Sequence, residues 1–393
     1  FMHIEIDQRN DPAGNEDLAQ YLLGVLADVR AAVTDWRPMR DRVAELVESG
    51  LDGPDAQEVT EARDFLNWLA EDHFTFLGWR SFHFAEDGSI GTITGSGLGI
   101  LRDPTTRMFD EARALAVMPP EVRDFVRRPN LLLITKSNRT ATVHRPVPMD
   151  IIGLKRFDGG GRVVGLEAIL GLFAATAYTL SPTLIPVLRR KVERVIARTG
   201  FLPDSHDGKA LLHIIESYPR DEVFQMSEDA LFEAVLGILH LQERQRVALF
   251  LRHDEFDRFI SCLVYVPRDR YDTRLRHAFR AILEQSFNGH LATFSTEVGN
   301  APLARIHFII HIDPDAIPDY RRQDIEARLA EAARSWMDRV QETLIAVHGE
   351  EHGLHLARRY AEAFPASYGE TTGIRAAAFD IGRIEAVLAG SGL

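Results

Sequence analysis

The order of predicted elements between residues 247 and 340 constrains the fold of this chain more than any other feature. Four segments have the composition of β-strands and two have the apolar spacing of helices. They are the strands 247–253 and 258–266, a helix with apolar positions 275–282, the strands 291–298 and 303–312, and a long helix with apolar positions 325–340. This ββαββα order is that of a ferredoxin-like module, in which helices cover one face of an antiparallel sheet.

The strand at 258–266 has apolar residues on both faces. Phe259, Leu263 and Tyr265 alternate with a second set that includes Ile260 and Cys262. An antiparallel sheet with helices on one side usually leaves its other side polar. We therefore expect a second covering layer, from another module of the chain or from a neighbouring subunit.

The first half of the chain predicts a second antiparallel sheet. Its strand candidates are 73–84, 89–94, 131–135, 140–147, 151–157 and 162–173, with turns at Gly88 and at 158–161. Before this sheet we expect a helix over 18–36 that Pro38 limits, a linker at 49–55 and a helix over 59–69.

The segments after this sheet are helical. Ser181 and Pro182 predict the start of a helix that ends at Gly200, and two more helices are expected at 209–217 and 227–242. The tail after Gly349 begins with a helix, and its last element is either a strand or a helix. The fold class is therefore α+β.

Composition excludes several classes of protein. The net charge of −13, from 58 acidic and 45 basic residues, argues against a nucleic-acid partner. No apolar run approaches the about 18 residues of a membrane span, so no membrane partner is expected. The opening FMHIEID is unlike a signal peptide and has the pattern of a strand end, so the chain is expected to be a piece of a longer protein. The single cysteine, Cys262, indicates a reduced, cytoplasmic core residue.

The motifs do not identify a reaction. The glycine-rich Gly95–Ile100 departs from G-x-G-x-x-G and is expected to be a loop, and no Walker, H-E-x-x-H or G-x-S-x-G motif occurs. The consecutive Ser205, His206 and Asp207 are better explained as a helix cap than as a catalytic triad. We therefore assign no catalytic, cofactor-binding or metal-binding residue.

Two groups of histidines leave alternatives open. His348, His352 and His355 have helical spacing that suits a metal, but a solvated helix face explains them more simply. On the strand 303–312, Arg305, His307 and His311 point away from the apolar face. They face an anionic ligand, another domain or water, and water is the default.

Several long segments carry a resemblance to a known family. They are Glu61–Arg80, Val143–Asp158, Leu202–Gln225, Leu241–Thr273 and Tyr360–Glu370. Together they resemble the N-terminal half of the large bacterial NAD-specific glutamate dehydrogenases. In that family the catalytic domain lies towards the C-terminus of a much longer chain, and the N-terminal half holds ACT-like, PAS-like and helical modules.

The resemblance implies a division of the chain. Residues 1–55 are the end of a first ACT-like module plus a helical linker, 56–200 a PAS-like antiparallel sheet domain, 201–245 a helical connector, 246–345 a ferredoxin-like ACT-like domain and 346–393 a C-terminal helical extension. The implied role is that of a non-catalytic regulatory and assembly segment.

The resemblance also implies the chemistry of the parent enzyme, which converts L-glutamate, NAD and water to 2-oxoglutarate, ammonia and NADH. We expect NAD in the parent and no cofactor in this chain. The implied partners are the C-terminal catalytic domain and further copies in a homo-oligomer. The alternative role is a stand-alone sensor of small molecules such as amino acids, and an independent metal-dependent enzyme comes third.

An ACT-like module implies an effector site at the edge of its sheet. The candidate residues are Arg268, Arg270 and Asp272, in the turn between the second strand and the helix that follows. The free backbone N–H groups at the start of that helix favour a carboxylate. The alternative is that these charges pair with each other or with a neighbouring domain, and that the module has lost ligand binding.

Overall fold

The computed structural model describes residues 12–85, 90–106, 128, 130–243, 245–254, 258–299, 301–313, 316–360 and 362–390. It divides into two compact units, Phe1–Leu239 and His240–Leu393, each described here by itself. The strand expected at residues 1–7 and the turn at Gly88 lie outside the described residues. Both units contain an antiparallel sheet with helices, which confirms the α+β class. Within the described ranges, no helix is both long enough and apolar enough to cross a membrane.

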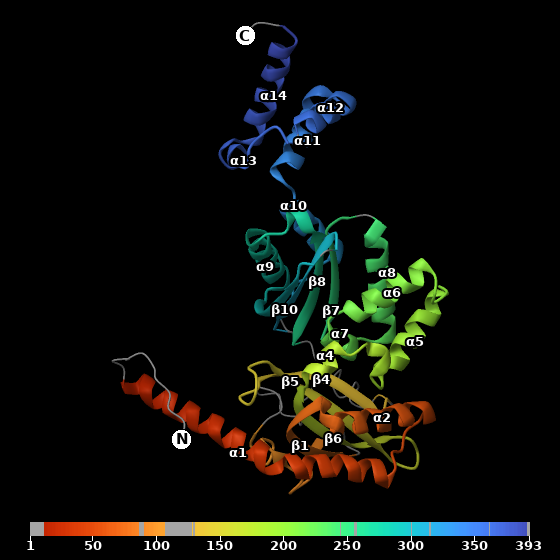
Figure 1. Cartoon of the computed structure of the whole chain (residues 1–393). Coiled ribbons are helices and arrows are strands. Elements are labelled where there is room, and N and C mark those ends of the chain that lie inside the picture. Colours follow the sequence, from red (N-terminus) through yellow and green to blue (C-terminus); the bar gives the residue numbers. More distant parts are fainter. Residues whose placement is uncertain are drawn as a thin grey trace. The chain divides into compact units, whose positions relative to one another are not determined.

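The first unit is built on a six-stranded antiparallel sheet (Figure 1). Its strands are β1 (Phe74–Phe84), β2 (Ile90–Thr92), β3 (Leu98–Gly99), β4 (Leu132–Thr140), β5 (Pro148–Phe157) and β6 (Val163–Phe173). The order is β2-β1-β6-β5-β4, with β3 also paired to β1. The predicted hairpin between β5 and β6 is confirmed, and Asp158 N–H donates to the Arg162 carbonyl at 2.9 Å across its turn.

One of the predicted strands is wrong. The expected strand at 140–147 is irregular, and β4 instead continues to Thr140. His144 has a left-handed φ of 69°, and Pro146 has no N–H to give to a ladder. These two residues keep the segment between β4 and β5 out of the regular ladder.

Helix α1 (Pro12–Ser49) contradicts the prediction that Pro38 ends the first helix. Proline removes the bond to the carbonyl four residues earlier, which belongs to Thr34. Thr34 is exposed, so water can satisfy that carbonyl. Met39 and Val43, both buried, hold the second half of the helix in place beyond the proline.

The helix expected from Ser181 to Gly200 is also interrupted. Ser181 caps a short 3-10 turn, η3 (Pro182–Leu184), and the longer helix α5 (Leu188–Thr199) begins only after Val187, which has a φ of 71°. Pro186 disfavours helical backbone at the residue before it, and Ile185 is extended accordingly. The predicted end is confirmed, because Gly200 is in the left-handed conformation that glycine favours after a helix.

The first unit contains further helices. They are α2 (Ala56–Trp68), the π-turn η1 (Leu69–His73), α4 (Ala175–Thr179), α6 (His206–Ser217), α7 (Arg220–Gln225) and α8 (Glu228–Glu243), the last of which runs into the second unit. Helix α7 follows Pro219 and was not predicted.

The second unit contains the predicted ββαββα order. Strands β7 (Ala248–His253), β8 (Phe259–Pro267), β9 (His290–Glu297) and β10 (Leu303–His311) form an antiparallel sheet of order β7-β8-β10-β9. Helices α9 (Thr273–Phe287) and α10 (Arg322–Ala332) pack on one face of it (Figure 1). The core residues that they share with the sheet include Ile260, Phe279 and Leu329, all fully buried.

Strand β8 is buried along its whole length. Cys262 lies in the core under α9 and α10, and Leu263, on the opposite face, is only 2% exposed. Both faces of this strand are therefore buried, and the origin of the second covering layer in another module or a neighbouring subunit stays a prediction.

The long helix expected at 325–340 is two helices, α10 and α11 (Trp336–His348). Ser335 and Asp338 form a capping box: Asp338 N–H donates to Ser335 Oγ at 3.0 Å, and Ser335 N–H donates to Asp338 Oδ2 at 2.8 Å. This cap starts a new helix. The tail continues as α12 (Glu350–Tyr360), α13 (Ala366–Thr371) and α14 (Ile374–Leu388), so its last described element is a helix.

Candidate effector site at the end of the four-stranded sheet

The predicted effector residues lie in the turn from β8 to α9. The strand ends at Pro267, a short 3-10 turn η4 covers Arg268–Arg270, and α9 begins at Thr273. Asp272 is the N-cap of α9, and its carboxylate accepts from Leu275 N–H at 2.6 Å. This contact satisfies one of the free N–H groups at the start of the helix.

The two arginines bind other parts of the unit. Arg268 donates to the Gly299 carbonyl at 3.2 Å. Arg270 forms an ion pair of 3.0 Å with Asp338, in the first turn of α11. The structure therefore places all three candidates in one turn and gives each a partner within the chain. Effector binding by Arg268, Arg270 and Asp272 stays a prediction.

A cavity of about 420 Å³ opens beside this turn. It lies between the start of β7, the end of β8 and α10, and its lining consists of Gln245, Arg246, Val247, Pro267, Arg270, Ala327, Ala330, Glu331 and Arg334. We call it the arginine cavity. Three guanidinium groups surround it, and only Arg270 among them was a predicted site residue.

Each arginine of the cavity is paired with a carboxylate. Arg246 contacts Glu326 at 2.7 Å, and Arg334 contacts Glu331 at 3.0 Å and Glu342 at 2.7 Å. These carboxylates raise the pKa of Arg334 above its ordinary value. The side chain of Arg334 is 30% exposed and that of Arg246 is 59% exposed, so solvent reaches both.

A buried charge cluster in the first unit was missed by the sequence reasoning. Lys136 of β4 lies 2.6 Å from Asp150 of β5 and 3.2 Å from Asp221 of α7. Tyr178 donates its hydroxyl to Asp221 at 3.0 Å, and the Asp150 carboxylate accepts from Phe173 N–H at 3.1 Å. Lys136 is one of only four lysines in the chain, which is the one signal in the sequence that marks it.

Burial governs the protonation of this cluster. It raises the pKa of Asp150 to about 6, although Lys136 favours the ionised form. Burial also acts to lower the pKa of Lys136, but Asp150 and Asp221 outweigh it and hold that pKa above its ordinary value. Each group has a charged or hydrogen-bonded partner, so the cluster joins β4, β5 and α7 as a structural unit.

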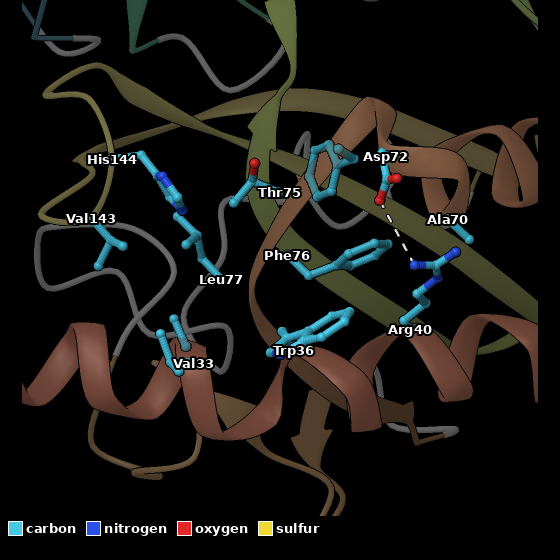
Figure 2. Close-up of a pocket in the computed structure, with 12 residues that line it drawn as sticks. Val33, Trp36, Arg40, Ala70, Asp72, Thr75, Phe76, Leu77, Val143 and His144 are labelled. Atoms are coloured by element: carbon cyan, nitrogen blue, oxygen red, sulfur yellow. Dashed lines mark ion pairs between the residues drawn. The ribbon is translucent and has the colours of Figure 1, made fainter.

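A second cavity, of about 270 Å³, lies between α1 and β1 (Figure 2). Val33 and Trp36 of α1 face Phe76 and Leu77 of β1 across it, and Arg40 reaches Asp72 at 3.7 Å. Asp72 is 94% exposed in its side chain, so this ion pair is weak. The lining is mostly apolar.

The Gly95–Ile100 segment is a loop with a two-residue strand, as expected, and α1 fixes it. The buried Asp35 accepts from Gly99 N–H at 2.7 Å and from Arg102 Nε at 3.0 Å. Gly99 has a φ of 59°, and a Cβ at this position would lie 2.1 Å from the Leu77 carbonyl oxygen. The absence of a side chain at Gly99 therefore allows this loop to pack closely against β1.

The other candidates have structural partners. Ser205 caps α6, as predicted, accepting from Gly208 N–H at 3.1 Å. His307 is hydrogen-bonded to Ser261 at 2.8 Å, and the rings of His348 and His352 lie 5.5 Å apart. Among the residues that the structure describes, no group of three or more His, Cys, Asp or Glu is arranged to hold a metal ion.

Comparison with protein families gives three matches. The glutamate dehydrogenase ACT2 domain matches residues 248–337, helical motif 1 of glutamate dehydrogenase matches 185–244, and its helical motif 2 matches 343–387. The ACT2 match covers the four-stranded sheet with α9 and α10, together with most of the arginine cavity. The third match covers the C-terminal part of α11 and the helices that follow.

Curated relatives agree with these matches. The chain is 39% identical over 389 residues to an NAD-specific glutamate dehydrogenase of Halomonas elongata, covering 97% of this chain and 24% of the relative. It is 34% identical over 381 residues to that of Pseudomonas aeruginosa (94% and 23%) and 30% identical over 388 residues to that of Mycobacterium tuberculosis (93% and 22%). The chain thus spans about a quarter of the length of these relatives. It belongs to the large NAD-specific glutamate dehydrogenases, as the segment that contains their ACT2 domain and two helical motifs.

Proposed function

We propose that this chain is the non-catalytic regulatory and assembly segment of an NAD-dependent glutamate dehydrogenase. The parent enzyme converts L-glutamate, NAD and water to 2-oxoglutarate, ammonia and NADH in the cytoplasm, and residues outside this segment hold the NAD. The observation that carries the proposal is the ACT2 match over a ferredoxin-like unit, within a chain that covers about a quarter of its relatives.

The proposal includes the division of the chain given above, with residues 56–200 as a PAS-like domain. It also includes the partners: the catalytic part of the same polypeptide, further copies in a homo-oligomer, and an effector at the turn of Arg268, Arg270 and Asp272. An exposed loop beside a rigid sheet suits a binding role, because loops tolerate the residue choices that recognition needs.

Two measurements on purified protein test this function. The chain incubated with NAD and L-glutamate is expected to form no NADH above a control without protein, since it contains no dinucleotide-binding motif. In sedimentation experiments it is expected to associate with the remaining part of a full-length relative, such as the Halomonas elongata enzyme. NADH formation by the chain alone would contradict the non-catalytic role, and failure to associate would contradict the assembly role.

The second candidate is a stand-alone sensor of amino acids. The observation that favours a sensor is that the second unit has its own hydrophobic core. A unit with its own core can in principle fold alone and bind a ligand without a catalytic partner. A sensor would bind its ligand but would not associate with the catalytic part of a relative, so the sedimentation experiment separates the two.

A further inference from the structure

The arginine cavity combines charge and shape in a way that defines a ligand class. Arg246, Arg270 and Arg334 surround it and Glu331 is the one acid in its lining, so cations outnumber anions on its wall. The rest of the lining consists of the polar Gln245 and the apolar Val247, Pro267, Ala327 and Ala330. Its volume of about 420 Å³ suits a small molecule.

Arg270 and Arg334 already bind carboxylates of the protein. Their partners are Asp338 at 3.0 Å and Glu342 at 2.7 Å, both on α11. All four side chains are at least 30% exposed, so these pairs are not locked by burial. Guanidinium groups bind a carboxylate through two parallel hydrogen bonds whether it belongs to the protein or to a ligand.

We propose that the arginine cavity binds a small dicarboxylate, whose two carboxylates replace Asp338 on Arg270 and Glu342 on Arg334. The proposal rests on the regulatory role given above and specifies its effector. A short carbon chain between the two carboxylates would lie against the apolar lining. A phosphate carries one anionic centre and would leave one of the two arginines with its protein partner.

The exchange would couple the ligand to α11. Arg270 belongs to the ACT2 domain, whereas α11 begins at the end of that domain and continues into helical motif 2. Binding would therefore replace two ion pairs that join the two parts of the unit. Because coupling between sites is reciprocal, weakening those ion pairs by mutation must strengthen ligand binding.

The test is isothermal titration of the whole 393-residue chain with succinate at constant ionic strength. Propionate and phosphate serve as probes with a single anionic centre. Succinate is expected to bind, and Arg270→Gln and Arg334→Gln are each expected to weaken it at least about tenfold, because each removes a charge-assisted pair. Arg280→Gln is the matched control, since Arg280 lies on α9 outside the cavity and pairs with Glu284 at 3.1 Å.

Asp338→Asn is the decisive variant. Asparagine keeps an oxygen for the Ser335 N–H but no longer competes for Arg270 as an anion, so succinate is expected to bind more tightly than to the wild type. Unchanged or weaker binding of succinate to Asp338→Asn would contradict the proposal that the ligand's carboxylates replace those of Asp338 and Glu342. Three other results would contradict the arginine cavity as the dicarboxylate-binding site. They are absence of binding at millimolar succinate, equal binding of propionate or phosphate, and wild-type affinity in both arginine variants. None of these outcomes depends on a catalytic partner, so failure here is distinct from failure of the association experiment.

Discussion

At the scale of single residues, two buried charges of the first unit join elements that are distant in the sequence. Asp35 holds the Gly95–Ile100 loop, and Lys136 joins two strands to α7. Charged residues are almost never buried unless they are paired, so each of these positions depends on its partner. Such pairings bring together residues far apart in the chain, which is why no local pattern indicated them.

Lys136→Ala is expected to destabilise the first unit by about 3–5 kcal/mol at pH 8, because it leaves Asp150 buried beside Asp221 with no cation. Urea unfolding measures the loss. At pH 5 the loss is expected to be smaller, since burial already raises the pKa of Asp150 to about 6 and protonation removes its charge.

The matched control for this variant is Arg162→Ala. Arg162 pairs with Asp158 at 2.9 Å, but its side chain is 74% exposed, so the change in the free energy of unfolding is expected to stay within about 0.5 kcal/mol. A loss in Lys136→Ala no larger than in this control would contradict the structural role of the cluster.

At the scale of elements, the sequence predicted the existence of most helices and strands but not their interruptions. The ββαββα order follows from apolar periodicity, which tertiary packing reinforces. The misjudged boundaries lie at Pro38, Val187 and Ser335, and at Pro38 the local rule competes with the burial of Met39 and Val43. Two of these boundaries had a readable signal: Pro186 before Val187, and the capping-box pair Ser335 and Asp338. Only one of the three arginines of the arginine cavity was predicted, because Arg270 is in the turn but Arg246 and Arg334 come from other elements.

His311, at the end of the β9–β10 pair, is expected to make the stability of the second unit depend on pH. His311 is opposite His290, and their rings lie 5.5 Å apart. Burial, with a smaller contribution from His290, lowers the pKa of His311 below 6.5. The native state therefore binds fewer protons than the unfolded state, and stability is lost as the pH falls below about 6.5.

His311→Gln is expected to reduce this loss, because glutamine does not titrate. The measurement is the free energy of unfolding of wild type and variant in urea between pH 7.5 and 5.5. Parallel profiles of wild type and variant across that range would contradict the assignment.

Helix packing in the tail predicts opposite effects for two glycines. A Cβ at Gly353 of α12 would lie 2.5 Å from the Ile345 Cα of α11, so Gly353→Ala is expected to destabilise the tail by about 1–3 kcal/mol. Gly382 of α14 has no such neighbour within 4 Å, so Gly382→Ala is expected to stabilise it by about 0.5–1 kcal/mol. Helical circular dichroism during urea unfolding measures both, and equal effects of the same sign would contradict the packing of α12 on α11.

At the scale of the whole molecule, the chain consists of units with separate cores. The first unit has a core under its six-stranded sheet, whereas the second has one core between its sheet and α9 and α10 and another among the helices of its tail. A unit with its own core can in principle fold alone. The net charge of −13 adds self-repulsion but does not determine this division.

Separate cores predict that the two units unfold independently. Lys136 forms ion pairs with Asp150 and Asp221 in the first unit, and the close neighbours of Gly353 lie in the second. Lys136→Ala is therefore expected to accelerate hydrogen exchange only in residues before 240, and Gly353→Ala only in residues after it. In the double variant the two losses of stability should add to within about 0.5 kcal/mol, because mutations without shared partners are independent. If either single variant accelerates exchange in both units equally, the units unfold as one, and a ligand in the arginine cavity would then stabilise the entire chain.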